Sequence, residues 1–324
     1  MKYRILAIAG ILSLCWVLVV GSLKSSWAMQ KMADFRADLG IPSTLLAQTQ
    51  WYTPPGIPVV GCQTRPKWNP PQPNIETTFQ KGSLTISRFR QTALSSAVNA
   101  LPERSANNRV GDRNYTPREE ITLANPTNFG ERYYQDVNGQ PVNNDPIIVI
   151  HETVIPAWQT VRFFQTYNPR DSDQASYHTL IKQDGTIFYL VPPDKRAFGA
   201  GNSVFNGESV KTNRLYASSV NNFAYHIAFE TPPDGRNNGN VHSGYTDLQY
   251  ESLAWLISKT GVPDSRISYH KAVDRSGSRK DPRSFNTQKF QQLLSLYPKS
   301  QEIVIGCPAP FAQPSAQPSL NPSF

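Results

Sequence analysis

Several motifs that would define a function at once are missing from this sequence. It has no P-loop, no aromatic signature of RNA-binding domains and no internal repeat, and only three of its 324 residues are cysteine. Its lysines and arginines are scattered along the chain instead of forming one basic cluster. These absences argue against a nucleic-acid partner and against a repeat architecture.

The chain is nevertheless basic, with a formal net charge of +8 and a pI of about 9.3. A positive surface suits nucleic acid, anionic lipid or an acidic polymer such as a bacterial cell wall, and charge alone does not choose among them. Hydrophobic residues make up 39% of the chain, enough for a globular core, whereas 27 prolines predict long irregular segments.

Residues 1–29 predict export from the cytoplasm. Lys2 and Arg4 precede an uncharged, mostly apolar run over residues 5–23, and small residues follow at 25–28. This order is typical of a signal peptide. The apolar run is long enough that an uncleaved membrane anchor is a real alternative. We therefore expect the protein in the periplasm or cell envelope, with membrane contact only through this segment.

The cysteines fit an oxidising compartment. Cys15 lies inside the apolar run and is interpreted as a small apolar residue. Its removal with the signal leaves Cys62 and Cys307, and an even pair in an exported protein predicts a disulfide. Two free buried thiols are the alternative. The bridge would join the N-terminal extension to a predicted strand over residues 302–306.

Residues 30–140 are predicted to form a proline-rich extension that packs on the main domain, residues 141–300. The expected elements are a helix from residue 30 towards 39, a weak strand over 83–87, and a hairpin after residues 131–137 with a type I′ turn at Asn138-Gly139. Residues 301–324 are expected to form a C-terminal strand and a low-complexity tail.

Between residues 141 and 300 the patterns of strands and helices alternate, which predicts one α/β domain. Thr246 is the expected N-cap of one helix, and residues 182–185 are expected to turn between two strands of a hairpin. The predicted strands are residues 147–150, 176–181, 186–191, 224–230 and 266–269, and the predicted helices are residues 157–165, 247–257 and 286–296.

Three residues of this domain form a candidate metal site. His270 ends a short strand, and the loop after it returns Asp281 towards the histidine. An imidazole and a carboxylate on one strand–loop unit suit a cation such as zinc, which takes three protein ligands in catalytic sites. His151, at the end of the apolar strand 147–150, is the best candidate for the third ligand.

The order of these motifs resembles the zinc-dependent N-acetylmuramoyl-L-alanine amidases of the type 2 amidase and peptidoglycan recognition superfamily. The resemblance covers about residues 145–298 and rests on Ile-Val-Ile-His151, Ser-Tyr-His178 with Asp184-Gly, strand-end Glu230, Tyr-His270 and Lys280-Asp281-Pro282. It implies a single mixed β-sheet flanked by helices, with one zinc ion in a groove at the strand ends.

The resemblance also implies residue roles. It makes His151, His270 and Asp281 the zinc ligands, Glu230 the general base, and Lys280 the cation that stabilises the tetrahedral intermediate. Tyr177 matches a tyrosine that helps to position the zinc water in some relatives, and it is an auxiliary candidate here. Chemistry requires such a set, because amide hydrolysis needs activated water, a proton acceptor and a cation near the oxyanion.

Other histidines have simpler interpretations. His178 is expected to face the core and His242 to be solvated, while His226 shares the face of Glu230 without a clear role.

Relatives often carry Trp-His-Ala-Gly where this chain has Phe198-Gly-Ala-Gly201, which is expected to change substrate contacts. The insertion over residues 232–244 is expected to reshape one wall of the groove.

The predicted function is hydrolysis of the amide between N-acetylmuramic acid and L-alanine in peptidoglycan or its fragments, by a zinc amidase. The alternatives are a non-catalytic peptidoglycan-binding module on the same fold and a zinc hydrolase of another amide. The expected partner is peptidoglycan or a muropeptide, without nucleic acid, and the chain is expected to be a monomer.

Overall fold

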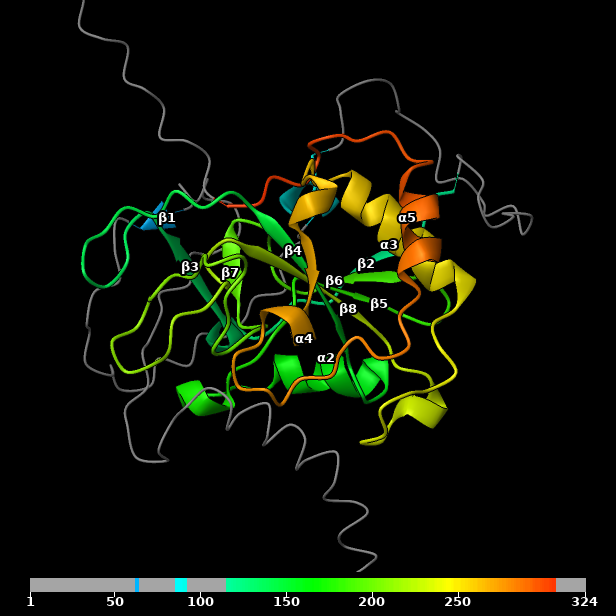
Figure 1. Cartoon of the computed structure of the whole chain (residues 1–324), viewed down its shortest axis with the longest axis horizontal. Coiled ribbons are helices and arrows are strands. Elements are labelled where there is room, and N and C mark those ends of the chain that lie inside the picture. Colours follow the sequence, from blue (N-terminus) through cyan, green and yellow to red (C-terminus); the bar gives the residue numbers. More distant parts are fainter. Residues whose placement is uncertain (1–61, 64–84, 92–114, 307–324) are drawn as a thin grey trace, which may run out of the picture.

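The computed structural model describes residues 62–63, 85–91 and 115–306 (Figure 1). The strands are β1 Cys62–Gln63, β2 Glu119–Ile121, β3 Phe129–Tyr133, β4 Ile147–Glu152, β5 Thr179–Ile181, β6 Ile187–Tyr189, β7 Lys195–Ala197, β8 Ala224–Phe229 and β9 Ile267–Tyr269. The α-helices are α2 Ala157–Gln165, α3 Asp247–Ser258, α4 His270–Val273 and α5 Thr287–Leu294. Short 3-10 turns are η1 Ile86–Arg88, η2 Pro126–Asn128, η3 Asp171–Asp173, η4 Pro233–Gly235 and η5 Asp264–Arg266.

A mixed six-stranded sheet forms the centre of the fold, in the order β2-β6-β5-β8-β4-β9. β5 and β6 pair antiparallel as a hairpin, whereas β5, β8, β4 and β9 run parallel to one another. A mixed sheet flanked by helices is the predicted fold class, and it is confirmed. The central position of β4 and β8 explains their apolar sequences, because parallel strands are covered on both faces.

Alternate residues of β4 belong to different cores. Ile148 and Ile150 pack with α3 and α5, whereas Ile147 and Val149 pack with the segment around residues 200–224. In Figure 1, α3 and α5 lie on one side of the sheet and α2 lies on the other. Because side chains alternate along a strand, His151 continues the face of Ile147 and Val149.

The central sheet begins before residue 141. β2 pairs with β6, and a second sheet of order β1-β3-β7 draws two of its strands from the predicted extension. Phe89 and Tyr115, which also precede residue 141, are buried in the main core. Part of the extension is therefore integral to the fold.

The predicted hairpin turn and helix N-cap are confirmed. Thr246 and Gln249 form a capping box at the start of α3. Gly185 has a φ of +79° in the β5–β6 turn, and a Cβ there would lie 2.8 Å from the Tyr115 hydroxyl. Only glycine satisfies both conditions without strain.

Three local predictions are wrong. The described part of the weak strand over 83–87 is the 3-10 turn η1. Residues 302–306 form no strand, because their backbone groups bond separately to Gln91, Lys259 and Pro193.

The turn at Asn138-Gly139 is not type I′. Only Gly139 has positive φ, at +83°, whereas a type I′ turn requires it at both central residues. The Asp136 carboxylate accepts hydrogen bonds from the N–H groups of Asn138 and Gln140 and so stabilises a longer turn.

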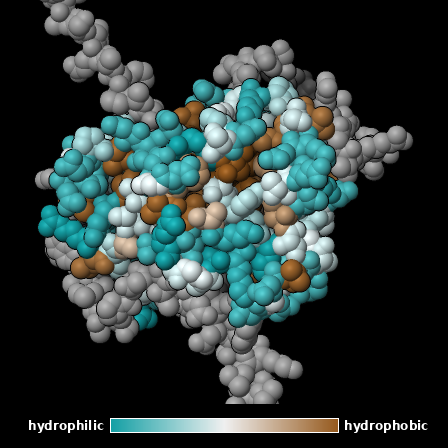
Figure 2. Space-filling model, in the orientation of Figure 1, coloured by the Kyte–Doolittle hydropathy of each residue, from teal (hydrophilic) through white to brown (hydrophobic). Residues whose placement is uncertain are grey.

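Other predictions lie outside the described residues. They are the signal peptide or anchor, the helix after residue 30, the low-complexity tail and the Cys62–Cys307 disulfide, since only the backbone of Cys62 is described. Within the described ranges no helix is both long and apolar enough to cross a membrane. Figure 2 shows apolar residues in separate groups among hydrophilic ones on the face in view.

Candidate metal centre

His151 reaches the site from the central strand β4. It lies opposite Ala228 of β8, and its side chain is completely buried. Its Nδ1 atom has no hydrogen-bond partner among the described residues. A buried nitrogen without a partner is costly unless another group, such as a cation, satisfies it.

His270 reaches the same place from the neighbouring strand. Ile150 of β4 pairs with Tyr269 of β9, so the residue after each of them is a histidine at the same end of the sheet. The rings of His151 and His270 have their centroids 4.5 Å apart. His270 is also the first residue of the short helix α4.

The loop after α4 brings Asp281 to the two histidines. The Asp274 carboxylate accepts hydrogen bonds from the N–H groups of Ser276, Ser278 and Arg279, which folds the loop back. Lys271 N–H donates to the Asp281 carbonyl oxygen, 2.9 Å away. These local bonds make the return of Asp281 a property of the loop itself.

The resulting group has the geometry of a metal site. Asp281 Oδ2 lies 3.0 Å from His270 Nδ1 and 3.4 Å from His151 Nδ1. One ligand atom from each of the three residues lies within 4.8 Å of the others. Two imidazole nitrogens and one carboxylate oxygen fit zinc, and the lack of a hydrogen bond to His151 Nδ1 among the described residues supports that fit. The structure thus brings together the three predicted ligands.

The electrostatics give His151 and Asp281 the protonation states that a cation requires. Burial, reinforced by His270, lowers the pKa of His151 to about 4, so its imidazole is neutral at pH 7. Burial alone would raise the pKa of Asp281, but His270 and His151 hold it well below its usual value. A neutral imidazole and an ionised carboxylate are the forms that bind metal.

Tyr177 belongs to this site. Its ring centroid lies 4.6 Å from that of His151, and the side chain is buried. Burial, together with the negative charge of Asp281, raises the pKa of the Tyr177 phenol above its usual value. The phenol is therefore neutral at pH 7 and keeps its hydrogen as a donor.

The described contacts of the Glu230 carboxylate are with the start of α2, the β5–β6 turn and Arg236, and not with the three candidate ligands. Oε1 accepts a hydrogen bond from the N–H of Ala157 at the start of α2, and Oε2 accepts one from the N–H of Gln183. Arg236 also lies 3.4 Å from Oε1. Ala228, not Glu230, is the β8 residue opposite His151. These contacts suit a residue that fixes α2 and the hairpin turn.

The charge of Arg279 is felt at the site. It contributes a lowering to the pKa values of both His151 and Tyr177, although burial has the largest effect on each and raises the pKa of Tyr177 overall. The Lys280 ammonium instead bonds to the Asn238 carbonyl and the Asn240 side chain. In extended chain, residues 279 and 281 share one side while 280 points away, a pattern that the sequence already contains.

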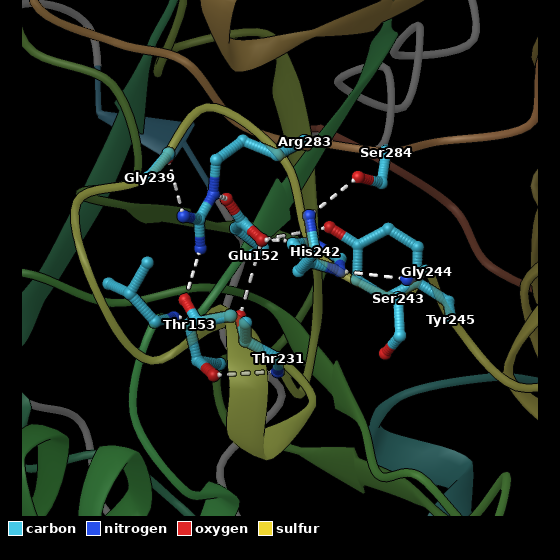
Figure 3. Close-up of polar contacts among 12 residues, drawn as sticks. Glu152, Thr153, Thr231, Gly239, His242, Ser243, Gly244, Tyr245, Arg283 and Ser284 are labelled. Carbon is cyan, nitrogen blue, oxygen red and sulfur yellow. Dashed lines mark hydrogen bonds and ion pairs between the residues drawn. The ribbon is translucent and has the colours of Figure 1, made fainter.

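A second polar cluster surrounds Glu152 (Figure 3), whose side chain points to the opposite face of β4 from that of His151 because neighbouring residues of a strand alternate. The buried Glu152 carboxylate accepts hydrogen bonds from Arg283, His242 and Tyr245. The Arg283 guanidinium also donates to the carbonyl oxygens of Gly235, Asn237 and Gly239. This cluster fixes the insertion over residues 232–244 to the end of the central strand.

The prediction that His242 is solvated is therefore wrong. Its side chain is 0% exposed and its Nε2 lies 3.0 Å from Glu152. Gly244 N–H donates to His242 Nδ1, so Nε2 carries the hydrogen that Glu152 accepts. Composition suggested a surface loop at this position, whereas a buried carboxylate from a distant strand determines the environment of the histidine.

Fold and site together define a mixed α/β protein with a candidate mononuclear metal centre. The sequence profile of the N-acetylmuramoyl-L-alanine amidase family matches residues 140–284. The 1,6-anhydro-N-acetylmuramyl-L-alanine amidase AmpD of Citrobacter freundii is 30% identical over 170 residues, covering 47% of this chain and 82% of that protein. The AmpD of Escherichia coli is 28% identical over 168 residues, covering 46% and 82%. The chain belongs to the N-acetylmuramoyl-L-alanine amidase family.

Similar solved structures include proteins of the same kind. A crystal structure of a selenomethionine AmpD derivative matches at a TM-score of 0.39 and 21% identity, covering 56% of this chain and 98% of that chain. The N-acetylmuramoyl-L-alanine amidase LysC from Clostridium intestinale matches at a TM-score of 0.36 and 21% identity, covering 56% and 99%.

Proposed function

We propose that this protein hydrolyses the amide bond between N-acetylmuramic acid and L-alanine in peptidoglycan or its fragments, with one zinc ion held by His151, His270 and Asp281. The observation that carries the proposal is the convergence of these three ligand atoms within 4.8 Å, with His151 Nδ1 buried and without a hydrogen bond among the described residues. When bound, zinc supplies Lewis-acid chemistry that polarises a carbonyl and activates water at neutral pH.

The protein's own residues orient and stabilise the reacting amide. Tyr177, a neutral phenol beside His151, donates a hydrogen bond to the carbonyl oxygen as negative charge develops on it. Arg279 adds a positive charge that acts on His151. Glu230, the general base expected from the sequence, is assigned instead to the support of α2 and the hairpin turn. Lys280 is assigned to the contact with the insertion.

The amidase activity is tested with purified peptidoglycan and with a 1,6-anhydro-muropeptide, since the AmpD relatives are named for the anhydro substrate. Zinc-loaded wild type is expected to release peptides with new L-alanyl N-termini from at least one of them. His151→Ala is expected to fold, as judged by circular dichroism, and to release none. A wild type without activity on either substrate, or an equally active His151→Ala variant, would contradict the proposal.

The cellular setting is part of the same proposal. A peptidoglycan amidase outside the cytoplasm agrees with the signal-like residues 1–29 and with a Cys62–Cys307 disulfide. Mass spectrometry of the mature protein from the cell envelope tests both features. It is expected to find cleavage after the apolar run or an intact anchor, and to find the two cysteines joined.

A further inference from the structure

His226 is a fully buried histidine that the proposed chemistry does not use. It lies on β8 two residues before Ala228, so its side chain shares the face of His151. His226 Nδ1 is 2.9 Å from His151 Nε2, which is a hydrogen bond between the two imidazoles. The contact is on the ring nitrogen of His151 that faces away from Asp281.

If His151 binds a cation through Nδ1, the donor and the acceptor of this hydrogen bond are determined. The His151 Nδ1 atom that faces Asp281 must then offer a lone pair, so the hydrogen of the neutral ring must be on Nε2. His226 Nδ1 accepts that hydrogen. The opposite arrangement, with His226 donating, would put the hydrogen of His151 on Nδ1 and block the ligand position.

Both the backbone and the ring of His226 are held by their surroundings. The backbone N–H donates to His178 Nδ1, and the carbonyl accepts the N–H of His178. On one side the ring lies directly against Gly199, where a Cβ would be 2.5 Å from Cγ, 2.6 Å from Nδ1 and 2.8 Å from Cδ2. The lack of a side chain at residue 199 is what leaves space for this imidazole.

We propose that His226 is a positioning residue, which accepts the Nε2 hydrogen of His151 and thereby holds His151 in the tautomer and orientation that present Nδ1 to the metal. Hydrogen-bond partners of metal-ligating histidines typically act in this way. The inference rests on the proposed zinc site. It adds a residue of β8 that packs against Gly199 and touches neither metal nor substrate.

The test compares full-length wild type with His226→Leu and His226→Asn. Leucine removes the acceptor, whereas the asparagine Oδ1 can accept the same hydrogen bond. Zinc affinity is measured by competition with a chelator, and the His151 tautomer by ring ¹⁵N chemical shifts of the metal-free protein. His226→Leu is expected to weaken zinc binding about 10- to 100-fold and to lose the pure Nε2–H tautomer, and His226→Asn is expected to preserve both.

Two further variants separate positioning from general damage. Gly199→Ala adds a methyl group against the His226 ring and is expected to weaken zinc binding in the same direction as His226→Leu. Tyr225→Phe changes a buried neighbour that packs in the core on the other face of β8, and zinc affinity is expected to be unchanged. If His226→Leu does not fold, Gly199→Ala still tests whether displacing the His226 ring weakens zinc binding.

The outcomes distinguish this inference from the proposed function. A folded wild type that binds no zinc would overturn the proposed function and the inference with it. If wild type binds zinc and His226→Leu binds it equally well with the same His151 tautomer, only the inference is wrong. Equal loss in His226→Leu and His226→Asn would also overturn it, because the acceptor would then be irrelevant.

Discussion

Tyr177 and Glu230 compete for the role of the side chain that meets the reacting amide. Tyr177 touches His151, whereas both oxygens of Glu230 accept backbone hydrogen bonds. We expect Tyr177→Phe to lower kcat by about 10²- to 10³-fold, the usual cost of removing one donor to an oxyanion. Zinc content is expected to be unchanged. The measurement is the rate of L-alanyl N-terminus release from a soluble muropeptide.

Glu230→Gln is the matched variant for this comparison. Glutamine still offers one carbonyl oxygen to the N–H of Ala157 or Gln183, but it removes the negative charge at the start of α2. We expect a loss of about 0.3–1 kcal/mol in stability and a smaller loss in kcat than for Tyr177→Phe. A larger loss of kcat in Glu230→Gln would restore the general-base role to Glu230.

The sequence was sufficient to find the three candidate ligands but not their surroundings. Local pattern points to all three. His151 and His270 follow recognisable strands, and Asp281 is the central residue of a characteristic Lys-Asp-Pro sequence. The motif alone points to Lys280, whereas the alternation of side chains relative to Asp281 favours Arg279. The contact of His226 with His151 depends on the β4–β8 register, which local sequence does not specify.

At the scale of elements, Arg283 determines how the insertion over residues 232–244 sits. It pairs with the buried Glu152 and donates to three carbonyl oxygens of the insertion. We expect Arg283→Ala to lower the free energy of unfolding by about 3–5 kcal/mol, because Glu152 would be left as a buried, poorly compensated charge. Urea unfolding followed by circular dichroism measures the change.

Arg275→Ala is the control for this prediction. Arg275 is exposed and lies in the same loop region, so its removal is expected to change stability by no more than about 0.5 kcal/mol. A loss below about 1 kcal/mol in Arg283→Ala would show that the cluster is not the main support of the insertion.

The elements that sequence predicted well are those with strong local signals. α2 has the predicted bounds, and α3 begins with the predicted Thr246 cap, because periodicity and capping chemistry are local. Residues 302–306 look like a strand by composition, yet their partners are three unrelated segments. Strand formation needs a neighbour, and no local pattern supplies one.

At the scale of the whole molecule, three buried neutral histidines make stability depend on pH. Burial lowers the pKa of His151 to about 4 and holds those of His178 and His226 well below the usual value. In the unfolded chain they titrate near about 6.5. Below that pH the unfolded state binds more protons, so native stability falls as pH falls.

We therefore expect the metal-free protein to be most stable above about pH 6.5 and to lose up to about 1.4 kcal/mol per pH unit per histidine below it. Urea unfolding from about pH 8 to pH 5 measures the slope. The carboxylate of Asp281 affects stability in a separate pH range. Because its pKa is lowered in the folded protein, its contribution is lost only as pH falls below the usual pKa of 3.8. A flat profile between about pH 6.5 and pH 5 would contradict the buried, neutral state of these histidines.

The zinc content of purified wild type and Asp281→Ala tests the central claim most directly. Asp281 Oδ2 contacts both histidines, so its removal breaks the group without touching the central strands. We predict about one zinc per chain in wild type and its loss in a folded Asp281→Ala variant. A folded wild type without zinc, or an Asp281→Ala variant that holds zinc as tightly as wild type, would contradict the assignment of this site.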